Sequence, residues 1–263
     1  MRTFRVAVLA VLAIAFVAPV AVAAPPTGLD RPGRKDIAMQ IVSSAENSSL
    51  KWRDQYTYLE DIGDGRGYTG GIIGFCSGTG DMLEVVQSYT DAHPDNGLAR
   101  FLPALRDVNG TDSHRGLGRP FVRAWHAAAK TAGFRHAQDV ERDRVYFDPA
   151  VRRATLDGLR TLGQFIYYDA IVMHGPGSSR LSFGGIRRAA MRHADTPAEG
   201  GSEAPYLDAF LDARVHAMKA EAAHEDTSRV DTAQRVFLRD HNFGLTPPLT
   251  WHVYGDRFHI AAP

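Results

Sequence analysis

The placement of strand-like and helix-like segments constrains the possible folds of this chain more than any other feature. Only 52–59 and 68–75 are short, aromatic and β-branched, and the glycines between them favour an antiparallel hairpin or small sheet. From Asp81 onward, apolar residues recur mainly at helical spacing. The helical segments are 81–90, 98–105, 121–131, 134–140, 186–193, 206–223 and 229–241. The sequence therefore predicts a mainly α fold (α+β class) with a small antiparallel β-sheet near the front.

Two more helices suggest the domain organisation. One is predicted over 36–45, with Asp36 as its cap and Glu46 at its C-terminal end. The other opens at Asp148-Pro149, a capping residue followed by proline at the first helical position, and runs to about 174. No repeat or long linker follows residue 33. We therefore expect one domain over 34–263, with two lobes joined by the long helix over 148–174.

The residues before this domain have a different character. Arg2 and Arg5 precede an almost wholly apolar run over 6–22, and Ala21-Val-Ala23 matches a small-x-small cleavage site. This pattern is typical of a secretory signal peptide over 1–23, so we expect a secreted, extracellular protein. A membrane anchor is the alternative, but the run is short for a spanning helix and contains a proline. A loose, proline-rich lead-in over 24–33 would follow the cleavage site.

Charge is balanced overall but unevenly distributed. Removing Arg2 and Arg5 with the signal peptide changes 30 basic against 30 acidic residues to 28 against 30, a net charge of −2. No basic excess indicates nucleic acid as a partner. Residues 36–91, however, hold nine acidic and three basic side chains. A cleft lined by one sign of charge attracts ligands of the other sign, so a cationic substrate is one interpretation and a solvated acidic face is the other.

Two other patterns argue against an internal disulfide and against a dinucleotide-binding site. Cys76 is the only cysteine and lies in an apolar run, so the chain has no internal disulfide and we expect a buried side chain. Gly65-x-Gly67-x-x-Gly70 matches a dinucleotide fingerprint as a string, but a strand-like run follows it where a helix is required. We therefore predict no cofactor and no catalytic metal.

Glu46 and Asp64 form the most informative pair of acidic residues. Asp64 lies 18 positions after Glu46, inside a glycine-dense turn over 60–71. Glycoside hydrolysis needs two carboxyl groups held across the scissile bond, one protonated and one ionised. A helix end facing a glycine-rich hairpin is a plausible way to hold them, whereas two unrelated surface acids are the alternative.

Four segments carry a resemblance to a known family. They are Ser44-Ala-Glu46-Asn-Ser-Ser-Leu-Lys-Trp52, Tyr58-Leu-Glu-Asp-Ile-Gly-Asp64-Gly-Arg-Gly-Tyr-Thr69-Gly-Gly, Gly74-Phe-Cys-Ser-Gly-Thr-Gly-Asp81-Met-Leu and Asp226-Thr-Ser-Arg229. These segments look like the chitosanases of glycoside hydrolase family 46, and the likeness runs from about Gly28 to the C-terminus. The resemblance implies a lysozyme-like fold in which two lobes flank a substrate cleft. It also implies endo-hydrolysis of β-1,4 bonds in chitosan, a polymer of glucosamine, with inversion at the anomeric carbon.

The resemblance also implies roles for individual residues. Glu46 matches the general acid, Asp64 the general base, and Thr69 the threonine that helps place the attacking water. Asp81 matches a carboxylate that grips a substrate amine. An ion-pair network that supports the acid matches Arg229, Arg214 and Asp169.

The chemistry of an inverting hydrolase adds physical expectations. An acid must stay protonated near the working pH, so burial or neighbouring negative charge should raise the pKa of Glu46. Exposure and backbone donors in the glycine turn should keep Asp64 ionised. Room for the attacking water requires the two carboxyl groups to lie roughly 6.5–9.5 Å apart.

Further residues are candidates for binding protonated glucosamine units. Beyond Asp81, they are Tyr58, Glu60, Arg66, Glu221 and Trp52. Each has a structural alternative: the two aromatic residues pack against the sheet, the two glutamates lie on solvated surfaces, and the arginine bridges Asp64. We expect Trp125 to be a core residue.

Two other functions remain open from the residues. A secreted muramidase acting on peptidoglycan would use the same layout, although the acidic stretch favours a cationic polymer. A polysaccharide-binding protein without turnover is the second alternative, and the presence of both carboxyl groups with Thr69 argues against it. We expect chitosan or glucosamine oligosaccharides as partners, no membrane, and a monomer by default.

Overall fold

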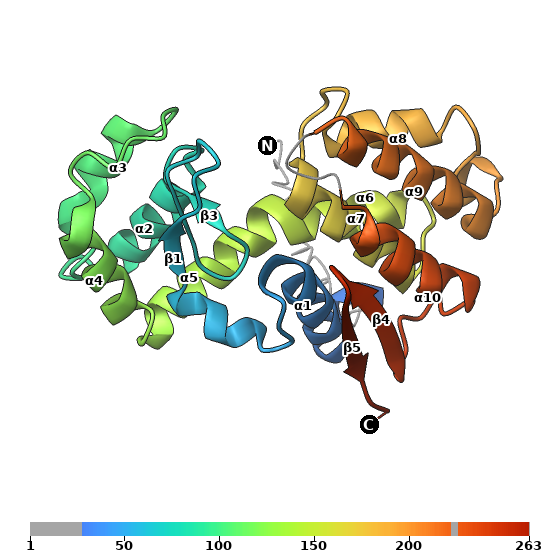
Figure 1. Cartoon of the computed structure of the whole chain (residues 1–263), viewed down its shortest axis with the longest axis horizontal. Coiled ribbons are helices and arrows are strands. Elements are labelled where there is room, and N and C mark those ends of the chain that lie inside the picture. The colour runs from blue at the N-terminus through green and yellow to red at the C-terminus, as the bar shows by residue number, and fades with distance from the viewer. Residues whose placement is uncertain (1–27, 222–225, 263) are drawn as a thin grey trace, which may run out of the picture.

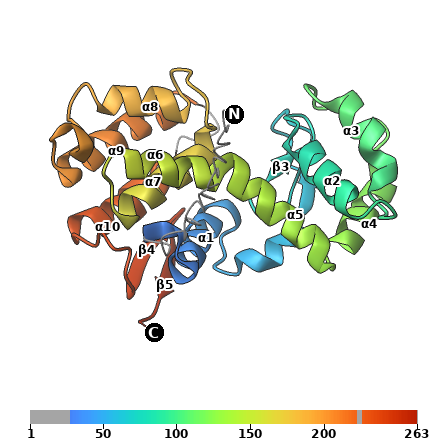
Figure 2. The ribbon, with the colours of Figure 1, turned by 180° about the vertical axis from the view of Figure 1, so that it is seen from behind.

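The computed structural model describes residues 28–221 and 226–262, so the predicted signal peptide over 1–23 lies outside the described residues. Figure 1 shows two lobes side by side, and Figure 2 shows the same arrangement from behind. One lobe holds the small sheet β1–β3 and helices α2–α5, and the other holds α1, α6–α10 and the hairpin β4–β5. The predicted mainly helical fold with a small antiparallel sheet is confirmed. None of the helices in the described part of the chain has the length and hydrophobicity of a membrane-spanning segment.

Helix α1 (Pro32–Asn47) belongs to the second lobe although it comes first in the chain. It begins with proline at its first position, where the missing N–H costs nothing, and not at Asp36 as predicted. The helix ends because Ser48 adopts a left-handed conformation with φ +47°. The segment before it is also more ordered than expected: Gly28–Asp30 forms a short 3₁₀ helix, and the N–H of buried Leu29 donates to Gln164 Oε1 at 2.8 Å.

The chain then crosses to the other lobe through a segment whose conformation differs from the predicted one. Residues 52–59 were expected to form a strand, but Trp52–Thr57 is a 3₁₀ helix. Trp52 is buried, and its indole N–H donates to Asp36 Oδ1 at 3.0 Å. This tertiary contact with α1 decides the local conformation, since strand propensity mainly reports how well a side chain packs.

The sheet has three short antiparallel strands, β1 (Leu59–Asp61), β2 (Tyr68–Gly70) and β3 (Phe75–Cys76), in that order. Thr69 at the centre of β2 is paired with Glu60 on one side and Cys76 on the other. The second predicted strand is shorter than 68–75 because Gly71 and Gly74, at φ +76° and +74°, turn the chain between β2 and β3.

Four helices complete the first lobe. They are α2 (Asp81–Ala92), α3 (Leu102–Val108), which follows a 3₁₀ turn over Ala99–Phe101, α4 (Gly118–Ala128) and α5 (Ala132–Arg142). Trp125 on α4 is completely buried and packs edge-on against Phe134, as expected of a core residue.

The connection back to the second lobe differs from the predicted helix over 148–174. Helix α5 continues without a break through a π-helical segment, η4 (Asp143–Phe147), into α6 (Asp148–Leu156). Pro149 cannot donate a helical hydrogen bond, and its ring clashes with the carbonyl four residues earlier, so the π-helical turn falls where proline disturbs the ladder. The helix then ends before Gly158 (φ +77°), and a separate helix, α7, spans Thr161–His174.

The second lobe packs around α7, whose residues are almost all buried. Around it lie α8 (Phe183–Ala190), α9 (Glu203–Lys219), the π-helix η7 (Arg229–Gln234) and α10 (Arg235–Arg239). The chain ends in an antiparallel hairpin, β4 (Leu249–Val253) and β5 (Asp256–Ile260), that the sequence did not predict. Its turn uses Tyr254 and Gly255 at φ +52° and +88°, and Tyr-Gly is a weaker signal than Asn-Gly.

Candidate active site

Glu46 lies in the last turn of α1, beside the point where the helix stops. Its side chain is 34% exposed, and Arg229 Nη1 donates to its Oε1 at 2.5 Å. The charged group in contact with Glu46 is therefore a cation, and not the negative charge that was one of the two expected surroundings. Arg229 is 183 positions away in the chain, so this contact exists only in the folded protein.

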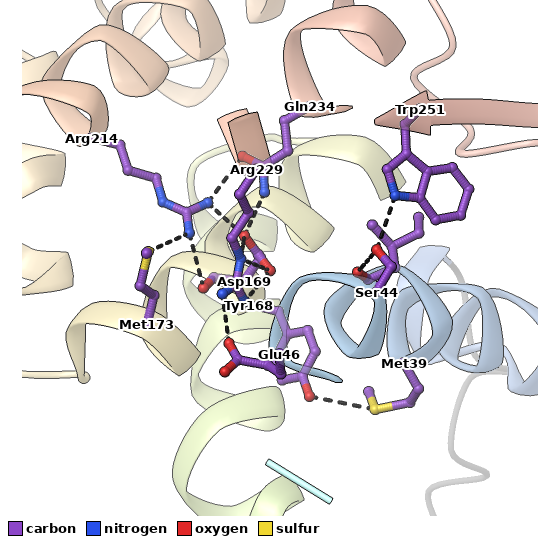
Figure 3. A network of polar contacts seen from close by, with 11 residues as sticks. Met39, Ser44, Glu46, Tyr168, Asp169, Met173, Arg214, Arg229, Gln234 and Trp251 are labelled. Carbon is purple, nitrogen blue, oxygen red and sulfur yellow. Dashed lines mark hydrogen bonds and ion pairs between the residues drawn. The ribbon is translucent and has the colours of Figure 1, made fainter. Parts of the chain in front are cut away.

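Behind Arg229 lies a buried ion network, shown in Figure 3. Asp169 on α7 accepts hydrogen bonds from Arg229 Nη2 at 2.7 Å and from Arg214 Nη1 at 2.6 Å. The amide of Gln234 donates to the same carboxylate at 2.6 Å, and Gln234 Oε1 accepts from Arg214. The structure thus brings together the three residues of the predicted network and adds Gln234, which no local sequence pattern indicates.

The buried charges in this network stabilise one another. Burial alone would raise the pKa of Asp169, but the guanidinium groups of Arg229 and Arg214 lower it to about 2. Burial would lower the pKa of Arg229, but the carboxylates of Asp169 and Glu46 raise it above its usual value. Arg229 is therefore a permanent cation whose position is fixed by its bonds to Asp169.

The end of α1 is also anchored from the side. The indole N–H of Trp251 on β4 donates to the hydroxyl of buried Ser44 at 2.9 Å (Figure 3). The Tyr168 hydroxyl on α7 contacts the sulfur of Met39 at 3.4 Å. The C-terminal hairpin and α7 thus both fix the helix that carries Glu46.

Asp64 lies in the other lobe, in the turn between β1 and β2. Gly63 and Gly65 on either side of it have φ values of +71° and +81°, which explains the density of glycine there. The backbone N–H of Arg66 donates to Asp64 Oδ1 at 3.0 Å, and Arg66 Nε and Nη2 donate to Oδ2 at 2.8 and 2.5 Å. Burial would raise the pKa of Asp64, but these bonds and the charge of Arg66 lower it below its usual value. The side chain is therefore kept as an accessible carboxylate.

Thr69 lies on β2, just beyond this turn, and is 6% exposed. Its hydroxyl lies 3.5 Å from the sulfur of Cys76, its partner on β3. Cys76 is buried, as predicted, and burial raises the pKa of its thiol above the usual value.

Tyr58 and Glu60 lie near Asp64. Burial raises the pKa of the Tyr58 phenol above its usual value, and the negative charges of Glu60 and Asp64 raise it further. Glu60 itself is exposed on β1, so its side chain is accessible to a ligand. The turn region therefore gathers Tyr58, Glu60, Asp64 and Arg66.

Asp81 is the first residue of α2, and its carboxylate is partly occupied by hydrogen bonds within the fold. Its Oδ1 accepts from the N–H groups of Cys76 and Met82 and from the Thr79 hydroxyl, while its Oδ2 accepts from the Tyr146 hydroxyl at 3.1 Å. A substrate amine would therefore have to approach Oδ2, beside Tyr146.

The remaining candidates lie elsewhere. Glu221 follows α9 in the second lobe, and its Oε2 lies 3.4 Å from His174 Nδ1. Trp52 is buried against α1, with Arg53 above its ring at 4.2 Å, so packing is its role in this structure.

Tyr254 also lies near this site, although no sequence pattern predicted it. It lies in the β4–β5 turn, is 48% exposed, and donates its backbone N–H to Ser228, the residue before Arg229. Burial raises the pKa of its phenol above the usual value, Arg229 opposes that effect and Glu46 adds to it, so the ring belongs to the surroundings of Glu46. The sequence around this tyrosine does not indicate that it lies near Glu46.

Comparison with known proteins identifies the family. The model of glycosyl hydrolase family 46 matches residues 40–249, which include all the candidate residues except Tyr254. The chain belongs to glycosyl hydrolase family 46. It is therefore a glycoside hydrolase, as the sequence predicted.

Individual members of family 46 resemble the chain over nearly all its length. A chitosanase from a Streptomyces species (strain N174) is 68% identical over 233 residues, or 89% of this chain and 84% of the relative. A solved chitosanase complex superposes with a TM-score of 0.87 at 61% identity, covering 89% of this chain and all of the other. The family 46 chitosanase of Gynuella sunshinyii, solved with chitotetraose, has a TM-score of 0.80 at 34% identity, covering 87% and 98% of the two chains.

Proposed function

We propose that this chain is a secreted, endo-acting chitosanase that hydrolyses β-1,4 bonds between glucosamine units with inversion. The observation that carries this proposal is the placement of Glu46 and Asp64 on different lobes, each bound by its own arginine. The chitosanases that resemble the chain, including one solved with chitotetraose, support the choice of substrate.

In the proposed reaction Glu46 is the general acid and Asp64 the general base. Glu46 gives its proton to the oxygen of the leaving sugar while a water attacks the anomeric carbon from the opposite face. Asp64 takes one proton from that water, and Thr69 helps to hold it. Inversion requires space for the water, so we expect the carboxyl groups to be roughly 6.5–9.5 Å apart in the substrate complex.

The arginines have different parts in this scheme. Arg229, fixed by Asp169, stabilises the negative charge that develops on Glu46 as it gives up its proton. Arg66 keeps Asp64 ionised and oriented. Carboxylates without a chemical role, such as Glu60, Glu221 and Asp81 through its Oδ2 beside Tyr146, would bind protonated amines of the polymer.

The main test of the residue assignment is Glu46→Gln. A positioned general acid contributes about 10²–10⁴ in rate, so we expect turnover of chitosan to fall by that factor while binding of glucosamine oligosaccharides is retained. Glu84→Gln is the matched control, because Glu84 is an exposed acid paired with Arg144 on the first lobe. A Glu46→Gln enzyme that keeps a tenth of the normal rate would contradict the assignment.

The stereochemistry and the substrate need separate tests. NMR of the first products should show the α-anomer, whereas β-product would rule out a single displacement. Fully deacetylated chitosan should be cleaved much faster than bacterial cell wall or chitin, and the opposite order would favour the muramidase. Release of reducing ends from chitosan separates both enzymes from a binding protein.

Secretion is part of the proposal and is tested by N-terminal sequencing. We expect protein recovered from the culture medium to begin at Ala24. Recovery of the full-length chain from a membrane fraction would instead support an anchor.

A further inference from the structure

We propose that Cys76 fixes the hydroxyl of Thr69 so that Thr69 presents only lone pairs, and no hydrogen, to the attacking water. This inference rests on the proposed role of Thr69 and assigns a positioning role to a residue outside the catalytic pair.

The backbone places these two side chains next to each other. Thr69 and Cys76 are direct partners across the β2–β3 ladder, where side chains on one face are close neighbours. Both are buried, at 6% and 1% exposure, so bulk water does not compete freely for their polar atoms.

The rotamer of Thr69 is held by the turn that follows it. A Cβ at Gly74 would lie 3.2 Å from Thr69 Cγ2, so the methyl group already packs closely against the glycine. The side chain of a β-branched residue is fixed by one torsion, and this contact together with the Oγ1–Sγ contact determines where the hydroxyl oxygen lies.

The direction of the hydrogen bonds follows from counting hydrogens. The Cys76 thiol donates its single hydrogen to the carbonyl oxygen of Gly74 at 3.2 Å. The carbonyl of Gly74 is both the nearer and the stronger of the two acceptors that the thiol hydrogen could reach. By geometry either atom of the Thr69 Oγ1–Cys76 Sγ contact at 3.5 Å could be the donor, and we assign it to the hydroxyl because the thiol hydrogen is used on Gly74. With its hydrogen used in this way, Thr69 Oγ1 can take part in further hydrogen bonds only as an acceptor.

This arrangement suits a nucleophilic water. The water donates one hydrogen to the Asp64 carboxylate and the other to Thr69 Oγ1, which leaves an oxygen lone pair to attack the anomeric carbon. If the Thr69 hydroxyl donated to the water instead, it would engage one of the two lone pairs of the water and draw electron density away from the attacking oxygen. The thiol stays intact and no proton leaves it during the reaction.

Substitution of Cys76 should therefore lower kcat without changing KM. One neutral hydrogen bond corresponds to about 2- to 10-fold in rate, so we expect losses of that size in Cys76→Ala and Cys76→Val. Cys76→Val fills the space of the sulfur without an acceptor and separates the hydrogen bond from packing. Cys76→Ser restores a donor and an acceptor and should recover much of the loss. Thermal unfolding of each variant shows whether the fold is intact.

The decisive measurement is a double-mutant cycle with Thr69→Val. If Cys76 acts through the Thr69 hydroxyl, Cys76→Ala should have no further effect on kcat once that hydroxyl is gone. An equal loss in both backgrounds, or a Cys76→Val enzyme with normal kcat and a normal unfolding temperature, overturns the inference.

The same experiment distinguishes failure of the inference from failure of the proposed function. If Glu46→Gln and Thr69→Val are inactive or slow while all Cys76 variants are normal, only the orientation of the hydroxyl is wrong. If Glu46→Gln or Thr69→Val is fully active, the proposed mechanism is wrong and the inference falls with it.

Discussion

The two carboxyl groups of the site are held in opposite ways. Asp64 is bound by Arg66, two positions along the chain, within a single exposed turn. Glu46 is bound by Arg229, which is 183 positions away and is itself held by the fully buried Asp169. The proposed base is thus placed by its own loop, whereas the proposed acid is placed by the core of the second lobe. Damage to the core should therefore affect the acid and leave the base in position.

The largest expected effect is loss of stability in Asp169→Asn. This change leaves the charges of Arg229 and Arg214 without their buried partner, and breaking a buried ion pair costs about 3–5 kcal/mol. Asp64→Asn is the matched control, since its partly exposed pair should change the free energy of unfolding by less than about 1 kcal/mol. Urea unfolding monitored by circular dichroism measures both, and equal losses would refute the contrast between the two regions.

The second expected effect is a pH dependence of the free energy of unfolding that is caused by the buried network. The pKa of Asp169 is about 2 in the folded protein and has an ordinary value of 3.8, so its contribution is complete above about pH 4 and is lost as pH falls toward 2. The expected loss is about 2 kcal/mol. Unfolding free energies from pH 5 to 2 should show this slope in the wild type and a weaker slope in Asp169→Asn. Identical slopes would mean that other carboxylates dominate.

The smallest effect should come from Arg66→Ala and should appear in activity more than in stability. Loss of Arg66 removes the bonds that lower the pKa of Asp64, so that pKa should rise toward its usual value. A base must be ionised, so the acidic limb of the pH profile of kcat/KM should move to higher pH. Arg66→Lys keeps the charge and should lie between the two. An unchanged profile would show that Asp64 does not set this limb.

Local patterns predicted the turn that carries Asp64 because every contact that shapes it is short in sequence. The glycines with positive φ around Asp64 and its bonds to Arg66 all lie within a few residues. Helix α2 was predicted almost residue for residue by the spacing of its apolar side chains. Local patterns failed where a distant residue decided the conformation, as Asp36 does for the 3₁₀ helix at Trp52.

The resemblance predicted an ion-pair network of Arg229, Arg214 and Asp169, but no local pattern could show which atoms pair with which. Each lies on a different element, η7, α9 and α7, and packing of the second lobe brings them into contact. Gln234 and Tyr254 were missed for the same reason, since their place beside the network depends on the π-helix η7 and on the terminal hairpin that packs against it.

Local patterns and motifs were enough to predict the helical class, the small sheet, the glycine turn that presents Asp64, and the family. Packing of the folded chain was needed to show that α1 joins the second lobe, that Arg229 contacts Glu46, and that Thr69 contacts the sulfur of Cys76. The physical reason is the range of the interactions. Torsional preferences and hydrogen bonds between near neighbours are encoded locally, whereas a buried ion pair forms only after the core has brought its partners out of water and together.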